Sequence, residues 1–91
     1  MPDKRPDEKM INELYDLVLS LESREDCKLL FSDLFTDREV EQMAQRVRAA
    51  KLLIDGKTYN QVIELTDISS ATLSRVSRCV KYGTGYTTFL K

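Results

Sequence analysis

Residues 58–78 have the sequence TYNQVIELTDISSATLSRVSR, in which two short helical patterns flank a turn. Thr58 and Gln61 have the T-x-x-Q spacing of a capping box, which predicts that a helix begins here. This helix can extend for only about two turns, because Thr66 and Asp67 interrupt its apolar pattern. Two helices joined by so short a connection predict a helix-turn-helix motif.

The second helix of this motif is predicted over residues 70–82. Ser69 or Ser70 can cap its first turn, and Gly83 follows its last residue. The positions at which the two helices of such a motif pack together are all apolar: Val62, Ile68, Leu73 and Val76. These four matches support the prediction of a helix-turn-helix.

Two positions depart from the usual motif. Ile63 stands where a small residue normally allows the two helices to touch, and Asp67 replaces the usual glycine of the turn. Aspartate adopts the left-handed backbone conformation more readily than most residues do. We therefore expect the turn to form in spite of the substitution.

Outside the motif, apolar residues recur at helical spacing over residues 7–21, 24–34 and 36–54. Thr36 and Glu39 form a further capping box, and Gly56 marks the end of the last of these segments. Since no segment alternates like a strand, we expect an all-α fold in a single domain, residues 1–91. Its expected parts are a helical dimerisation and core part over 7–55, the helix-turn-helix over 58–82 and a partly ordered tail over 84–91.

The charge of the chain is distributed unevenly. The net charge is only -1, but residues 1–45 contain 6 Lys and Arg against 12 Asp and Glu, whereas residues 46–91 contain 8 against 3. The positive charge therefore lies in the half that contains the helix-turn-helix, where a DNA-binding surface requires it.

The composition disfavours several other functions. The chain has no histidine, which removes the commonest general base and a frequent zinc ligand, and Cys27 and Cys79 lie far apart. We expect both cysteines to be core residues, and we expect no metal, no cofactor and no enzymatic activity. No apolar run approaches the roughly 20 residues of a membrane helix, so we expect a cytoplasmic protein.

The second helix of the motif carries most of the candidate DNA contacts. Arg75, Arg78 and Lys81 follow one another at three-residue steps and form a basic stripe suited to phosphates or guanine edges. Alternatively, these three side chains only form a solvent-exposed face that contacts no DNA. One of Ser69 and Ser70 is expected to serve as the helix cap. The full set of candidate DNA contacts is Thr58, Ser69, Ser70, Ala71, Thr72, Ser74, Arg75, Arg78 and Lys81.

The sequence resembles the Trp repressor family over roughly residues 10–83. The resemblance is carried by LFTDRE (34–39), RVR (46–48), LLIDG (52–56) and SSATLSRVSR (69–78). Within the family it is similar to the YerC/YecD branch, through GKTY (56–59), SRVSRC (74–79) and YG (82–83). The resemblance implies an intertwined helical homodimer and a sequence-specific transcriptional regulator of double-stranded DNA, expected to be a repressor. The alternative is a helical protein-interaction module that does not bind DNA.

The resemblance also implies a ligand site. Arg46 and Arg75 match the two arginines that face the corepressor pocket in members that bind tryptophan. In those members a glycine follows the second arginine, whereas here Val76 occupies volume that an indole ring requires. We therefore expect that tryptophan is not the effector, and that the pocket is either filled by side chains or used by a smaller ligand. Without a ligand, Arg46 would form an ion pair with Glu39 or Asp55.

Overall fold

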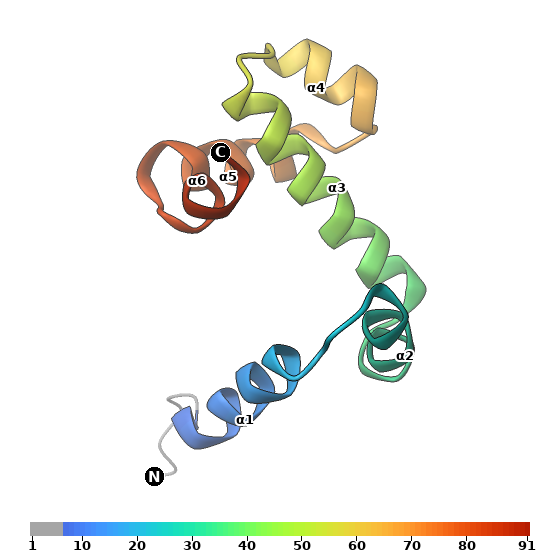
Figure 1. The fold of residues 1–91 in the computed structure, drawn as a ribbon. Coiled ribbons are helices and arrows are strands. Elements are labelled where there is room, and N and C mark those ends of the chain that lie inside the picture. Colours follow the sequence, from blue (N-terminus) through green and yellow to red (C-terminus); the bar gives the residue numbers. More distant parts are fainter. Residues whose placement is uncertain (1–6) are drawn as a thin grey trace, which may run out of the picture. The chain divides into compact units, whose positions relative to one another are not determined.

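Six helices and no strand make up the part of the chain that the computed structural model describes, residues 7–91. The helices are α1 (Glu8–Leu19), α2 (Arg24–Leu34), α3 (Asp37–Ile54), α4 (Tyr59–Thr66), α5 (Ser70–Tyr82) and α6 (Gly85–Leu90) (Figure 1). This confirms the expected all-α fold class. The chain divides into two compact units, Met1–Leu34 with α1 and α2, and Phe35–Lys91 with α3 to α6. None of the described helices is both long and apolar enough to cross a membrane.

The two helices of the first unit begin at side-chain caps. Asp7 Oδ1 accepts hydrogen bonds from the backbone N of Lys9 at 3.0 Å and of Met10 at 3.2 Å, and so fixes the start of α1. Ser23 Oγ accepts from the backbone N of Asp26 at 3.0 Å at the start of α2. Neither helix contains a fully buried residue. Capping therefore defines where these helices begin, whereas their apolar side chains stay at least partly exposed.

The second unit is built on α3, which is 18 residues long. Its predicted capping box is present, because Thr36 Oγ1 accepts from the backbone N of Glu39 at 3.1 Å and Glu39 Oε1 accepts from the backbone N of Thr36 at 2.9 Å. The chain leaves the helix through Gly56, whose φ of 94° lies in the region that favours glycine. Both ends of α3 thus form at the residues that the sequence indicates.

The predicted helix-turn-helix forms over α4 and α5. Thr58 and Gln61 make the reciprocal bonds of a second capping box, at 3.2 and 2.9 Å. Asp67 ends α4 in the left-handed conformation, with φ 60° and ψ 21°. The turn therefore keeps its geometry with aspartate in the place of glycine, as expected.

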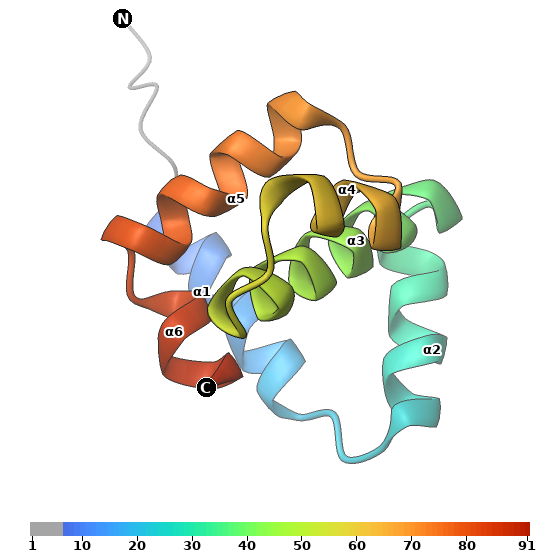
Figure 2. The ribbon, with the colours of Figure 1, turned by 90° about the horizontal axis from the view of Figure 1, so that it is seen from above.

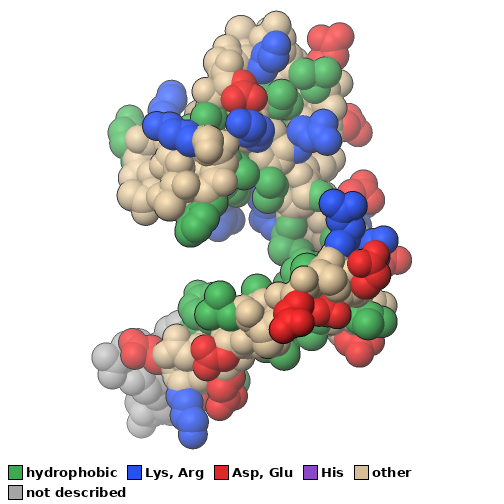
Figure 3. Space-filling model, in the orientation of Figure 1, with side chains coloured by type: hydrophobic (Ala, Val, Ile, Leu, Met, Phe, Trp, Pro, Cys, Tyr) green, Lys and Arg blue, Asp and Glu red, His purple; other side chains and the backbone are tan. Residues whose placement is uncertain are grey.

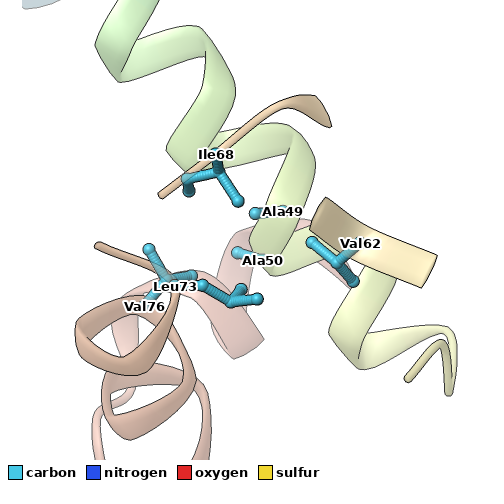
Figure 4. Close-up of a cluster of buried hydrophobic side chains, with 6 residues drawn as sticks. All are labelled: Ala49, Ala50, Val62, Ile68, Leu73 and Val76. Carbon is cyan, nitrogen blue, oxygen red and sulfur yellow. The ribbon is translucent and has the colours of Figure 1, made fainter. Parts of the chain in front are cut away.

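The core of the second unit lies where α4 and α5 pack against α3, with α6 beside the end of α5 (Figure 2). Its fully buried apolar residues, each at most 3% exposed, are Ala49, Ala50, Val62, Ile68, Leu73 and Val76. Figure 4 shows the side chains of α4, the turn and α5 converging on the two alanines of α3. Because alanine is small, α4 and α5 can approach α3 closely. All four core residues that the motif predicts are confirmed, and Ile63 packs half-buried against the same cluster.

The C-terminal segment differs from the expected partly ordered tail, because residues 85–90 form α6. A helix of six residues is marginal in isolation, and Thr84 provides no side-chain cap. Tyr86 and Leu90 pack against the core, and Lys51 Nζ donates a hydrogen bond to the carbonyl O of Leu90 at 3.0 Å. Contacts with α3 and α5 therefore stabilise a segment whose local sequence does not favour a helix.

Candidate nucleic-acid interface

Helix α5 has one buried face and one exposed face. The buried face includes Leu73, Val76 and Ser77, which are at most 4% exposed. The exposed predicted contacts on this helix are Ser70, Ala71, Ser74, Arg75, Arg78 and Lys81. At 3.6 residues per turn these residues lie on one side of the helix. The structure thus places most of the predicted contacts on one polar, basic surface that the core supports from behind.

Two other predicted contacts, Thr58 and Ser69, use their hydroxyl groups as helix caps. Ser69 Oγ accepts from the backbone N of Thr72 at 3.2 Å and donates to Thr72 Oγ1 at 2.9 Å. This confirms that one of the two adjacent serines is the cap. The exposed hydroxyls of Ser70 and Ser74 make no hydrogen bond to another residue in the described part of the chain, so both remain available to a ligand.

The basic side chains of α5 form a slanted stripe. Residues three apart differ by about 60° around a helix axis, so Arg75, Arg78 and Lys81 progress across the exposed face. Arg78 lies near the middle of this face. Arg75 lies at the edge that turns toward α3, where it lines a pocket together with Arg46.

This pocket has a volume of about 330 Å³ and opens between α3, α5 and α6. Its lining residues are Met43, Arg46, Val47, Arg75, Val76, Cys79 and Tyr86, and we name it the Arg46–Arg75 pocket. The structure therefore brings together the two arginines that the family resemblance singles out. Val76 lines the pocket, as expected, but does not fill it within this chain.

The ion pairs expected for Arg46 in the absence of a ligand do not form. Asp55 Oδ1 instead lies 3.3 Å from Lys51 Nζ, and Glu39 serves the capping box at Thr36. Within residues 7–91 neither acid pairs with Arg46. Arg46 is a half-buried residue that lines the pocket, and its guanidinium group is therefore available to a ligand.

Several residues of the pocket wall were not predicted from the sequence, and one cysteine lies elsewhere than predicted. Met43 lies one helical turn before Arg46, and this spacing could have identified it. Tyr86 had no such signal, because its helix was not predicted. Cys79, expected in the core, is exposed, since a step of three residues from Val76 rotates its side chain out of the core. Cys27 is half-buried.

Charge differs between the two units. On the face shown in Figure 3, acidic side chains predominate over α1 and α2, and basic side chains predominate over the second unit.

Hydrogen bonds from the backbone and the hydroxyl of Thr36 lower the pKa of Glu39, so this carboxylate stays charged at the start of α3. No group of acidic, cysteine or histidine side chains suited to a metal ion occurs among residues 7–91.

Comparison with known proteins identifies the family of this chain. Residues 9–91 match the family model described as Trp repressor protein. The chain belongs to the Trp repressor family. It is 41% identical over 75 residues to the uncharacterized protein YerC of Bacillus subtilis (strain 168), across 82% of this chain and 72% of YerC. This confirms the resemblance to the YerC branch. The family has a regulatory fold and not an enzymatic one.

Two solved structures share the fold. A protein of Staphylococcus aureus described as a candidate Trp repressor is 38% identical, with a TM-score of 0.87 over 90% of this chain and 83% of that chain. A TrpR-like protein of Eubacterium eligens ATCC 27750 is 34% identical, with a TM-score of 0.85 over 88% of this chain and 84% of that chain. The helical architecture is therefore that of Trp repressor-like proteins.

Proposed function

We propose that this protein is a homodimeric, sequence-specific DNA-binding transcriptional regulator that acts as a repressor in the cytoplasm. The observation that supports the proposal most directly is the exposed polar and basic face of α5. The opposite face of the same helix is anchored by Leu73 and Val76 in the core. A helix supported in this way can enter a major groove as a rigid reading element.

The residues of the interface have different roles in this proposal. Arg78 and Lys81 neutralise phosphates, whereas Ser70 and Ser74 lie on the part of α5 that approaches base edges. Arg75 contributes to base recognition from the edge of the same face. The remaining contacts of the proposed interface are Thr58, Ser69, Ala71 and Thr72, around the starts of α4 and α5.

A homodimer is part of the proposal because the first unit exposes many large apolar side chains. Those of α1 that are at least 40% exposed are Met10, Leu14, Tyr15, Leu17, Val18 and Leu19. Apolar surface of this extent on one helix is typical of a protein interface. A second copy of the chain would cover it and would present two α5 helices to DNA.

Control by tryptophan is not part of the proposal. Arg46 and Arg75 could hold the carboxylate of a small ligand, since guanidinium groups bind carboxylates in a bidentate manner. However, Val76 lines this pocket at the position where the members that bind tryptophan have glycine, and its two methyl groups reduce the room for a flat aromatic ring. We propose that DNA binding is either constitutive or controlled by a ligand smaller than tryptophan.

Fluorescence anisotropy with labelled DNA duplexes tests the proposal. We expect the wild-type protein to bind a mixed-sequence duplex at low salt, and Arg78→Ala to reduce the slope of log K against log salt by about 1. Arg75→Ala should weaken binding to a selected sequence by about 1 to 3 kcal/mol. Arg48→Ala removes an equal charge from the surface of α3 and is the matched control.

Two results would contradict the proposal. Absence of binding by the wild-type protein to any duplex at low salt would favour the alternative, a helical protein-interaction module. Equal effects of Arg78→Ala and Arg48→Ala would show that α5 has no special role. Thermal melting of each variant verifies that the fold is intact.

A further inference from the structure

The left-handed backbone conformation at position 67 explains why a turn-forming residue stands there, but it does not explain why that residue is charged. Asp67 has φ 60° and is the residue other than glycine that has a positive φ within residues 7–91. Glycine adopts this conformation without a steric cost, and asparagine tolerates it as well as aspartate does. The turn between α4 and α5 would therefore form equally well with a neutral residue.

The carboxylate of Asp67 also has no structural partner. Its backbone N donates to the carbonyl O of Ile63 at 2.8 Å, but in residues 7–91 its side chain forms no hydrogen bond or ion pair. It lines a polar cleft with Arg38 and Arg46 of α3. Glu41 lines the same cleft, so its lining contains two acids as well as two arginines and is not a purely basic anion site.

The position of Asp67 suggests a role toward DNA. It lies two residues before Ser69, the cap of the helix that carries the proposed contacts. From Gly56 to Lys91 the sequence contains only two acidic residues, Glu64 and Asp67, against five Lys and Arg residues. Charges interact over roughly 10 Å at moderate salt, so the carboxylate of Asp67 would act on any DNA phosphate bound beside the start of α5.

We propose that Asp67 is a negative determinant of DNA affinity. Its carboxylate repels phosphates beside the start of α5 and so limits sequence-independent binding by the basic helix. This inference rests on the proposed DNA-binding function and adds a residue that opposes binding. The turn geometry allows the charge to be removed without changing the backbone.

The test compares Asp67→Asn and Asp67→Gly with the wild-type protein, using anisotropy with a mixed-sequence duplex at about 50 mM and about 200 mM salt. Both variants tolerate the left-handed conformation. We expect both to bind about two- to fivefold more tightly than the wild-type protein at the lower salt, and the difference to shrink at the higher salt. Glu64→Gln removes the same charge from an exposed position of α4 that does not line the cleft, and should have a smaller effect.

Each outcome bears on a different claim. Unchanged affinity of Asp67→Asn, or an equal gain in Glu64→Gln, would overturn the role of Asp67. Weaker binding by Asp67→Asn would overturn it as well, and would indicate that the carboxylate accepts a hydrogen bond from a base, as it can from cytosine. If no protein binds the duplex while all of them melt like the wild type, the proposed function itself fails and this inference falls with it.

Discussion

Val76 serves both the core and the pocket wall. Its side chain is only 2% exposed, and it lines the Arg46–Arg75 pocket beside the second arginine. The family resemblance predicted that these two arginines would face one site, and the structure brings them together. The sequence left open whether side chains would fill this pocket, because its volume depends on how α3, α5 and α6 pack.

The first prediction concerns tryptophan. We expect no saturable binding of L-tryptophan at micromolar concentration in isothermal calorimetry, because forcing a ring against Val76 commonly costs about 1 to 3 kcal/mol. The Arg46→Ala variant is the control that shows whether any tryptophan binding takes place in the Arg46–Arg75 pocket. Micromolar binding that this variant abolishes would show that tryptophan is a ligand after all.

The second prediction concerns pH and Glu39. Its hydrogen bonds with Thr36 lower its pKa in the folded protein. A lowered folded-state pKa stabilises the fold above the unfolded-state pKa, and this stabilisation is lost as the pH falls through the folded-state value. We expect the melting temperature of Glu39→Gln to fall less than that of the wild type on acidification below about pH 4.5. Identical curves for Glu39→Gln and the wild type would refute this role of Glu39.

At the scale of elements, helices with a local start signal were predictable and α6 was not. The capping boxes at Thr36 and Thr58 placed the starts of α3 and α4 correctly, because capping depends on residues three apart in sequence. In contrast, α6 contains Gly85 and β-branched residues and has no side-chain cap. Its stability comes from contacts of Tyr86 and Leu90 with distant residues, which no local pattern reveals.

The third prediction tests this account of α6. Leu90→Ala should destabilise the protein by about 1 kcal/mol or more, because it removes partly buried apolar surface. It should also speed hydrogen exchange of α6 amides such as that of Thr88, which donates to the carbonyl O of Thr84 at 2.9 Å. Thr88→Ala, at an exposed position, is the control. Exchange in α6 that is unaffected by Leu90→Ala would contradict the account.

At the scale of the whole molecule, the chain combines an acidic, apolar first unit with a basic second unit. The charge difference between the two halves was evident from the sequence, and so was the excess of apolar residues in the first helices. The sequence could not reveal that α1 and α2 contain no fully buried residue within one chain. This exposure is the physical reason to expect a second copy.

The fourth prediction is a homodimer. Light scattering at micromolar concentration should give twice the chain mass of 10.5 kDa. Leu14→Asp places a charge on the apolar face of α1 and should shift the mass toward the monomer, whereas Glu13→Gln should not. A monomeric mass for the wild-type protein would refute the dimer.

The central claim is that two copies of α5 read DNA sequence together, and selection of bound duplexes from random-sequence DNA tests it most directly. We predict enrichment of a motif with two inverted half-sites, centred about one helical turn or a multiple of it apart, because two-fold symmetric proteins bind two-fold symmetric sites. The enrichment should be weakened by Arg75→Ala and retained in Arg48→Ala. Recovery of no common motif by a folded, dimeric wild-type protein would contradict the claim.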